Sequence, residues 1–385
     1  MKYLFPIEKI SNCKTPFYYY DVELLKKTLQ QVKVSSQKFN YHLHYAVKAN
    51  SNPRILSIIS GSGLGADCVS GGEIQVALDA GFSPDTIVFA GVGKADWEIQ
   101  LGLQHDIFCF NVESIPELQI INTLAGKTGK TASVAIRLIP EVDAHTHRHI
   151  TTGKKESKFG INLSQLDIVL DMIPLLKNIR LTGIHFHIGS QITDLSVFRQ
   201  LCNSLNLILK RMALRNIIPD HINVGGGLGI NYENPDQHLI PDFQTYFDLF
   251  NSHIQLSTNQ QLHFEPGRSI VGQCGTLISK VLYVKEGELI KFVVLDAGFT
   301  DLIRPILYGA YHQIDNITSK EPVETYDVVG PLCESTDFFG KSIMLNQTRR
   351  GDLIAIRSAG AYGEVMASQY NCRQLPSVYF SDQLS

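Results

Sequence analysis

The sequence of 385 residues predicts a (β/α)8 barrel of the TIM type, followed by a C-terminal domain built mainly of β-strands as a sandwich or small barrel. Three observations predict this fold class. Strand-like and helix-like segments alternate and give eight strands, polar residues and glycines follow these strands directly, and helical periodicity stops near Ser269. A doubly wound open sheet is the alternative for the first part, because alternation alone does not show that a sheet closes.

The strand segments are short, and most are followed by a helical pattern. The strands are expected at residues 39–47, 65–70, 86–90, 107–112, 133–139, 181–188, 221–224 and 261–265. The helices are expected at residues 53–60, 71–80, 95–103, from 114 onward, 164–176, 194–215 and 243–253. Two helix starts carry sequence signals: Pro53 suits the first helical position, and Ser114 with Glu117 has the spacing of a capping box.

The second domain is predicted from short segments rich in β-branched residues, separated by glycine and charged turns. These strands are expected at residues 276–284, 290–296, 325–329 and 352–357. We therefore expect residues 22–268 to form the barrel, and residues 1–21 with 269–385 to form the mainly β domain. The aromatic segment 15–20 (TPFYYY) is expected to add a strand to the β domain.

Composition excludes several classes of protein. With 44% hydrophobic and 18% charged residues the chain can bury large cores, and a net charge of −3 provides no basic excess for nucleic acid. No apolar run approaches the roughly 18 residues of a membrane span, and the first ten residues lack a long apolar stretch. The seven cysteines are scattered without a CxxC pair, which favours reduced thiols over structural zinc. We expect a soluble, cytoplasmic protein.

Lys48 stands at the end of the first predicted strand, in the segment YHLHYAVKAN. From residue 39 to 47 the odd positions are bulky and apolar, whereas the even positions include His42 and His44, so the strand has two unlike faces. Lys48 continues the polar face next to an apolar body. A lysine in this place is expected to be partly desolvated and able to form a Schiff base with a carbonyl. The alternative is a lysine that only caps the strand.

Polar residues and glycines follow the other predicted strands too. Because barrel enzymes carry their chemistry at the carboxyl ends of the strands, this is where we expect the site. The residues at the eight strand ends are Lys48, Asp67, Gly91, Asn111, Arg137, His187, the glycines 225–227, and Glu265 with Arg268.

Two of these strand ends carry short motifs. The segment GGGLG at 225–229 would let backbone amides approach an anion such as phosphate, or form only a tight turn. It is not a dinucleotide fingerprint, because that spacing needs glycine where Ile230 stands. In EPGR, Glu265 is suited to hold a proton on a heterocyclic nitrogen and Arg268 to bind a carboxylate or phosphate. A buried ion pair between them is the alternative.

The segment HFHIGSQ at 185–191 places two histidines on one strand face. His185 and His187 have a metal-ligand spacing, and His145, His147 and His149 form a second cluster, but no carboxylate completes either site convincingly. We therefore predict no metal. The competing use is an imidazole stacked on a ring, with Ser190 donating a hydrogen bond to an anion.

The motifs together resemble those of a known family. They are YAVKAN, DCVSGGE, SKFGI, HFHIGSQ, GGGLG, EPGR, RPILYGAYH, GPLCESTDFF and GAYGEVMASQYN. In this order, over most of the chain, they resemble pyridoxal-phosphate-dependent decarboxylases of the ornithine/diaminopimelate/arginine family with the alanine-racemase-like fold, most of all the diaminopimelate branch. The resemblance implies decarboxylation of meso-2,6-diaminopimelate to L-lysine with release of CO2, and a homodimer with composite active sites.

The resemblance also implies roles for individual residues toward the cofactor, pyridoxal 5'-phosphate. Lys48 matches the lysine that forms the Schiff base, His187 the residue stacked on the ring, and Glu265 the partner of the pyridine nitrogen. The residues that match other cofactor contacts are Asp67, Arg137, Ser190, Gly226, Gly227, Gly267, Arg268 and Tyr362.

Further roles concern the substrate. Arg268, Arg304, Tyr308 and Tyr362 match residues that bind the substrate and its distal carboxylate. Cys333 and Glu334 match residues donated by the other subunit, with the glutamate toward the distal ammonium and the cysteine as a catalytic proton donor.

Other activities remain open at this stage. A decarboxylase of another diamino acid would leave the arginines unpaired, at a cost of roughly 1.5–3 kcal/mol for each lost charged hydrogen bond. A racemase of the same fold would not need the CES segment at 333–335. A non-catalytic carrier of the cofactor would match only the barrel, and a metal-dependent barrel hydrolase would depend on the histidine pair.

Overall fold

The computed structural model describes residues 5–140 and 158–384. The chain divides into two compact units. We name them the barrel unit, formed by residues 29–229 and 242–267, and the β unit, formed by residues 1–28, 230–241 and 268–385. The division differs from the predicted domain ranges, since residues 22–28 and 230–241 group with the β unit.

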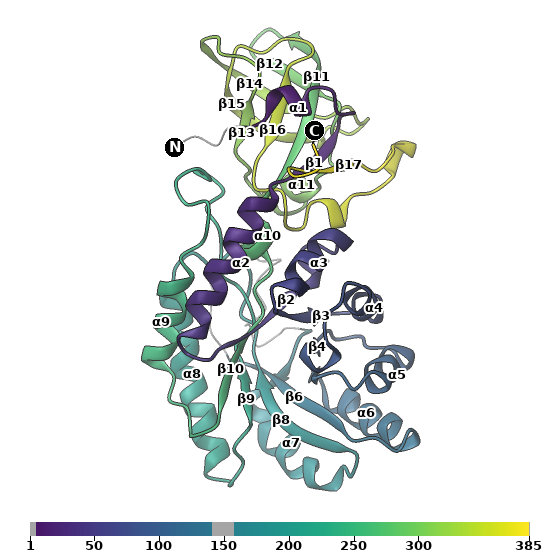
Figure 1. Ribbon diagram of the computed structural model, residues 1–385, viewed down its shortest axis with the longest axis vertical. Helices are drawn as coiled ribbons and strands as arrows, with labels where there is room; N and C mark the ends of the chain where they lie inside the picture. The colour runs from purple at the N-terminus through teal and green to yellow at the C-terminus, as the bar shows by residue number, and fades with distance from the viewer. Residues whose placement is uncertain (1–4, 141–157, 385) are drawn as a thin grey trace. The chain divides into compact units, whose positions relative to one another are not determined.

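Eight parallel strands form a closed barrel in the barrel unit (Figure 1). The strands are β2 (His42–Ala46), β3 (Gly65–Cys68), β4 (Ile87–Phe89), β5 (Cys109–Val112), β6 (Ala132–Ile139), β8 (Ile179–His185), β9 (His221–Asn223) and β10 (Gln261–Phe264). The first strand pairs with the last, β2 with β10, and β5 pairs with β6, so the ring has no edge. The short strand β7 (Ile161–Asn162) lies beside β6. The barrel prediction is confirmed, and the open sheet is wrong.

Helices connect the strands and surround the barrel in Figure 1. They are α3 (Pro53–Gly61), α4 (Gly71–Asp79), α5 (Asp96–Gln104), α6 (Ile115–Lys127), α7 (Leu166–Met172), α8 (Ser196–Ala213) and α9 (Phe243–His253), and α2 (Val22–Gln37) precedes β2. Short 3-10 helices are η1 (Val47–Ala49), η2 (Pro84–Thr86), η3 (Leu163–Gln165), η4 (Ile173–Leu175), η5 (Glu364–Met366) and η6 (Tyr370–Cys372). Throughout the described ranges, every helix is too short or too polar to cross a lipid bilayer.

The predicted helix starts are partly confirmed. Pro53 is the first residue of α3, and Ser114 caps α6 by accepting a hydrogen bond from the amide of Glu117. The carboxylate of Glu117 does not return to the cap residue, as a full capping box requires. It accepts from the amide of Glu113 and pairs with Lys94 instead.

Histidine rings fill the barrel near the amino-terminal ends of its strands. His44, His221 and His263 come from β2, β9 and β10, and the ring centroids of His221 and His263 lie 4.9 Å apart. His44 Nε2 lies 2.8 Å from His263 Nδ1, and His44 Nδ1 lies 2.9 Å from the carbonyl of Thr86. Gly183 makes room for this layer, because a Cβ there would lie 2.2 Å from Nε2 of His221. The polar position His44 of β2 therefore contributes to the barrel core, whereas His42 is exposed.

We predict that this histidine layer makes the fold acid-sensitive. Burial lowers the pKa of His44 and His263, and it lowers the pKa of His221 to about 3. A histidine in the unfolded chain has a pKa near 6.5, so it binds a proton at a pH where the histidines of the folded layer stay neutral. The stability that the neutral layer contributes is therefore complete above pH 6.5 and is lost as the pH falls toward 3. The loss is about 1.4 kcal/mol per pH unit for each such histidine.

Urea unfolding at several pH values measures this effect. Between pH 6 and pH 5, His221→Gln should reduce the slope of unfolding free energy against pH by about 1.4 kcal/mol per unit. The exposed His238, which lies outside this layer, provides the matched control, and His238→Gln should keep the wild-type slope. Equal slopes in the wild type and His221→Gln would show that His221 is not held neutral.

The β unit is a mainly antiparallel sheet with short helices. Its strands are β1 (Phe17–Tyr20), β11 (Gly275–Glu286), β12 (Lys291–Leu295), β13 (Ile314–Asn316), β14 (Val323–Val329), β15 (Phe338–Asn346), β16 (Leu353–Ile356) and β17 (Ser377–Phe380). Its helices are α1 (Ile7–Ile10), α10 (Arg268–Val271) and α11 (Arg304–Tyr308). The predicted strand in segment 15–20 is confirmed, since β1 pairs with β11 and β17. Parallel pairs are β1 with β17 and β12 with β14.

Candidate active site

Lys48 lies in a tight turn directly after β2. The strand ends at Ala46, one residue earlier than predicted, and Lys48 is the middle residue of η1. Its Nζ lies 2.7 Å from Oδ2 of Asp67, on the neighbouring strand β3. The side chain of Asp67 is fully buried, whereas that of Lys48 is 33% exposed. The amine is therefore held by a buried carboxylate, on a side chain that is partly exposed.

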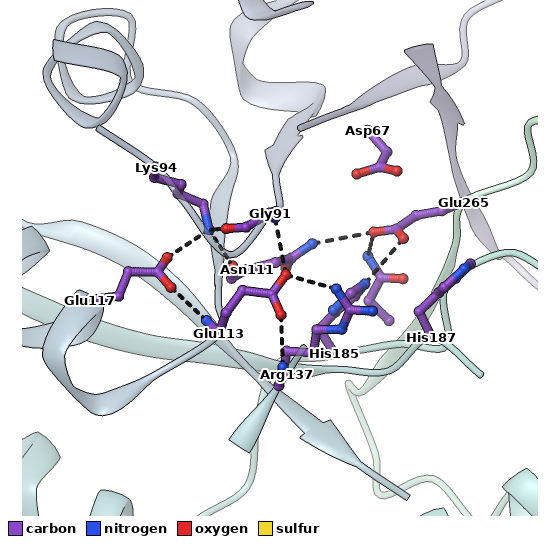
Figure 2. Close-up of polar contacts among 12 residues, drawn as sticks. Asp67, Gly91, Lys94, Asn111, Glu113, Glu117, Arg137, His185, His187 and Glu265 are labelled. Atoms are coloured by element: carbon purple, nitrogen blue, oxygen red, sulfur yellow. Dashed lines mark hydrogen bonds and ion pairs between the residues drawn. The ribbon is translucent and has the colours of Figure 1, made fainter. Parts of the chain in front are cut away.

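Glu265 follows β10, the other neighbour of β2. Its Oε1 accepts hydrogen bonds from Asn223 Nδ2 at 2.8 Å and Asn111 Nδ2 at 3.3 Å, and Oε2 lies 3.1 Å from Nε2 of His185 (Figure 2). Burial alone raises the pKa of Glu265. His185, through its electrostatic effect and its hydrogen bond, and the charge of Lys48 outweigh burial and hold this pKa well below its usual range. Glu265 is therefore a fixed anion.

Asp67 differs from Glu265 in its protonation. Burial and the neighbouring charge of Glu265 raise the pKa of Asp67 to about 6, although Lys48 opposes this shift. Two carboxylates in one buried place cannot both ionise easily, so the proton is taken up by the one with fewer donors. The site thus combines one permanent anion with one group that exchanges a proton near neutral pH.

The EPGR turn packs against the turn that carries Lys48. The carbonyl of Pro266 accepts a hydrogen bond from the amide of Ala46 at 3.1 Å. A Cβ on Gly267 would lie 3.0 Å from the Cβ atoms of both Ala46 and Ala49, so glycine permits this close approach. Gly267 therefore has a structural role that the sequence alone did not indicate.

The triple glycine also has a packing reason. A Cβ would lie 2.3 Å from the carbonyl of Phe186 if placed on Gly225, and 2.2 Å from that of Glu265 if placed on Gly226. Gly227 has a φ of +115°, which favours glycine. The amide of Gly226 donates to Nδ1 of His187 at 3.3 Å. The loop is a tight turn that brings His187 to the strand ends.

His187 is a neutral imidazole in this arrangement. Burial, followed by the charges of Arg137 and Lys48, lowers its pKa well below the usual value. Because Nδ1 accepts from Gly226, the ring proton is on Nε2. The half-buried Ser190 follows three residues later, in the loop after β8. His145, His147 and His149 lie outside the described residues, and within those residues no three His, Cys, Asp or Glu side chains are arranged to hold a metal ion.

Arg137 is held at the end of β6 by an acidic residue that the sequence analysis missed. Its Nη1 lies 2.7 Å from Oε1 of Glu113, and its guanidinium lies 4.8 Å from the ring centroid of Phe159. Glu113 also accepts hydrogen bonds from the amides of Gly91 and Gly160 (Figure 2). The only sequence signal was its place directly after a strand. This network fixes the direction of Arg137.

Arginine and aromatic side chains gather in the β unit. Arg268 Nη1 donates to the hydroxyl of Tyr232 at 2.6 Å, and its guanidinium lies 4.9 Å from the ring centroid of Tyr362. The guanidinium of Arg304 lies 4.9 Å from the ring centroid of Tyr232. Tyr308 ends helix α11, which begins at Arg304. Tyr232, which the sequence analysis missed, therefore contacts both predicted substrate arginines.

Cys333 and Glu334 lie on an exposed turn of the β unit. Oε1 of Glu334 accepts a hydrogen bond from Tyr370 at 2.6 Å. The buried Asp337 shapes this turn by accepting from the amides of Leu332 and Phe299, each at 2.8 Å. Both predicted residues are thus presented at the surface by a defined turn.

A comparison with known proteins identifies the family of this chain. The family model described as the pyridoxal binding domain of pyridoxal-dependent decarboxylases matches residues 23–272. The chain belongs to the pyridoxal-dependent decarboxylases. This family membership identifies the protein as a carboxy-lyase and implies pyridoxal phosphate as its cofactor.

Individual relatives show to which branch of the family this decarboxylase belongs. A protein of Bacteroides thetaiotaomicron named diaminopimelate decarboxylase is 59% identical over 385 residues, covering all of both chains. One of Aquifex aeolicus with the same name is 39% identical over 360 residues, 93% of this chain and 84% of the relative. The crystal structure of diaminopimelate decarboxylase from Helicobacter pylori complexed with L-lysine has a TM-score of 0.93 at 40% identity, covering 98% and 94% of the chains. The decarboxylase therefore falls among the diaminopimelate decarboxylases.

The residues of the barrel unit fit the cofactor of this decarboxylase family. Among the residues that the structure describes, three buried polar atoms beside Lys48 and Glu265 have no hydrogen-bond partner: Asp67 Oδ1, Asn111 Oδ1 and His185 Nδ1. Unpaired buried polar atoms are costly unless a ligand satisfies them. Lys48 supplies an amine for an aldehyde, and ionised Glu265 suits a protonated ring nitrogen. The donor set matches the chemistry of pyridoxal phosphate.

Proposed function

We propose that this protein decarboxylates meso-2,6-diaminopimelate to L-lysine and CO2, with pyridoxal 5'-phosphate as its cofactor. The observation that carries this proposal is the pairing of β2 with β10, which places the Lys48 amine and the ionised Glu265 on neighbouring strand ends. The identity of 59% over the whole chain to a protein named diaminopimelate decarboxylase supports the choice of substrate.

The protein's part in the reaction is to bind, orient and hold protons. When bound, pyridoxal phosphate supplies an aldehyde that condenses with amines and an electron-accepting ring that takes up the electron pair left by CO2. Lys48 is the amine that attaches to the aldehyde, and Asp67 beside it exchanges a proton near neutral pH. Glu265 would hold a proton on the ring nitrogen of the cofactor, and the neutral imidazole of His187 would support the ring.

The remaining cofactor contacts come from glycine loops and polar side chains. The phosphate is bound by Ser190, Gly226, Gly227 and Tyr362, with Arg268 near both phosphate and substrate. Asp67, Arg137 and Gly267 complete the cofactor site. The Gly226 amide, which donates to His187 here, would be one of the backbone donors available to a phosphate oxygen.

Substrate selection depends on charge. Meso-diaminopimelate carries a second carboxylate and a second ammonium at its distal end. Arg268, Arg304 and Tyr308 bind the distal carboxylate, with Tyr362 beside them, and Glu334 binds the ammonium. Holding the far end of the substrate would orient the carboxylate that is to be lost.

The proposed enzyme is a homodimer with shared active sites. Cys333 and Glu334 lie on an exposed turn, as residues donated to a second subunit must, and Cys333 is the proton donor after CO2 leaves. In this scheme residues 22–268 are the barrel domain, and residues 1–21 with 269–385 complete the partner's site. The seven cysteines are all unpaired, which supports a place in the reducing cytoplasm.

A turnover assay tests the proposal. Purified protein with pyridoxal phosphate should release CO2 and lysine from meso-diaminopimelate, and should act at least about 100-fold less efficiently on L-ornithine, which leaves the arginines without a carboxylate. Releasing the cofactor with hydroxylamine and then dialysing should abolish turnover, and adding pyridoxal phosphate back should restore it. Racemisation without CO2, or equal use of ornithine, would contradict the proposed activity.

A further inference from the structure

Arg304 in the β unit is a buried guanidinium with one edge occupied. It begins helix α11 and is 5% exposed. Its Nη1 donates to Nε2 of His312 at 2.8 Å. In residues 5–140 and 158–384 no carboxylate pairs with Arg304, and its Nε has no hydrogen-bond partner. A buried hydrogen-bond donor without an acceptor costs free energy, so we expect a ligand oxygen to bind at the Nε edge of Arg304.

His312 is an acceptor whose orientation is fixed from behind. The imidazole is 1% exposed, and its Nδ1 lies 2.8 Å from the backbone carbonyl of Arg357. A carbonyl only accepts, so Nδ1 carries the proton and Nε2 presents its lone pair to Arg304. Burial, followed by the charge of Arg304, lowers the pKa of His312 to about 3, so the ring stays neutral.

Arg357, whose carbonyl orients His312, is itself fixed by several contacts. Arg357 is 4% exposed, and its guanidinium pairs with Asp236 at 2.8 Å and with Asp315 at 3.3 Å. Its backbone amide donates to the carbonyl of Gln313 at 2.8 Å. The carbonyl that orients His312 therefore belongs to a residue fixed on several sides.

We propose that His312 is a positioning residue that occupies Nη1 of Arg304 and so directs the Nε edge toward the distal carboxylate of the substrate. This inference depends on the proposed function. Nε–H and Nη2–H lie side by side on a guanidinium and match the two oxygens of a carboxylate. With Nη1 engaged by His312, this side-on edge is the one that remains for the substrate.

The choice of histidine over an acid matters for specificity. An aspartate or glutamate in contact with Arg304 would neutralise it and compete with the substrate carboxylate. A neutral imidazole orients the guanidinium and leaves its charge to the ligand. Tyr232 assists, since its ring meets that of His312 edge-on at 5.0 Å and the guanidinium of Arg304 at 4.9 Å. His312 therefore favours ligands that carry a carboxylate at the distal end.

Two substitutions separate the functions of the ring. His312→Gln places an acceptor near the position of Nε2 and keeps the contact with Arg304. His312→Asn places a donor near the position of Nδ1, keeps the contact with the Arg357 carbonyl and loses Arg304. The readouts are the inhibition constants of L-lysine, which keeps the distal carboxylate, and of 1,5-diaminopentane, which lacks it, measured on the enzyme with its cofactor.

The expected result is a change in selectivity. His312→Asn should weaken inhibition by L-lysine about tenfold or more, while inhibition by 1,5-diaminopentane changes by less than about twofold, because only one ligand uses the Arg304 edge. His312→Gln should retain the wild-type preference within about threefold. The KM for meso-diaminopimelate should rise in His312→Asn more than kcat falls.

Contrary results have distinct meanings. Equal weakening of both inhibitors in His312→Asn, or no weakening of either, would overturn the positioning role. If the wild type does not turn over meso-diaminopimelate, or does not prefer L-lysine, the proposed function is wrong. This inference, which depends on it, is then wrong as well. If His312→Asn does not fold, ¹⁵N spectra of histidine-labelled wild-type enzyme provide the test, since a His312 that is cationic or protonated on Nε2 contradicts the proposal.

Discussion

Replacement of Lys48 by alanine should lower kcat/KM for meso-diaminopimelate by roughly 10³-fold or more, because it removes the amine that we propose attaches to the cofactor. The long-wavelength absorbance of the attached cofactor should disappear with the activity. Both are measured on purified protein after addition of pyridoxal phosphate, with circular dichroism as a check that the barrel remains folded.

Two control variants make the Lys48 result specific. Lys48→Arg keeps a positive charge next to Asp67 but cannot attach to an aldehyde under these conditions, so it should be as inactive as Lys48→Ala. Lys38→Ala removes an exposed lysine bonded to Gln244 and should keep full activity. An active, yellow Lys48→Ala enzyme would contradict the assignment.

Coexpression of two impaired variants should restore about a quarter of wild-type activity, because random pairing makes half of the dimers mixed and each mixed dimer has one intact site of two. One variant is Lys48→Ala, and the other carries Cys333→Ala with Glu334→Ala. The double variant alone should lose at least about tenfold, since a charged hydrogen bond to the substrate contributes roughly 1.5–3 kcal/mol. Differently tagged subunits allow the mixed dimer to be isolated and assayed.

The matched control for this recovery pairs Lys48→Ala with Glu265→Gln. Both residues belong to the barrel unit, so each mixed site has one defect and no activity should return. If the Cys333 and Glu334 turn served its own subunit, coexpression with Lys48→Ala would also restore nothing. That outcome would remove the shared-site scheme.

The parts of the fold that depend on local pattern were predictable from sequence. Helix α9 spans residues 243–253 as expected, and the eight barrel strands appear within a few residues of their predicted positions. In the β unit, β13 and β17 were missed because each has only three or four residues. β15 was missed because Gly340, Lys341 and Ser342 interrupt its alternation, and Ser342 has a φ of +52°.

Site residues that lie at the end of a strand were predictable from the sequence. Their hydrogen-bond partners were not predictable where the contact depends on how neighbouring strands align. Lys48 and Glu265 follow directly from the carboxyl ends of two strands. The contact of His185 and Asn223 with Glu265 requires that β8, β9 and β10 align as they do, with His185 beside Asn223 and Asn223 beside His263. No local sequence feature reports this alignment. The spacing of His185 and His187 therefore suggested a metal site, which was rejected, or a stacked imidazole, and it did not suggest the contact of His185 with Glu265.

The pairing of β2 with β10 has a consequence for biogenesis. Lys48 leaves the ribosome early, but the carboxylate that completes its surroundings is synthesised only after the seven further strands of the closed barrel. A nascent chain that stops before Glu265 lacks the strand that joins the two ends of the ring. We therefore expect firm binding of the cofactor only after the ring is joined.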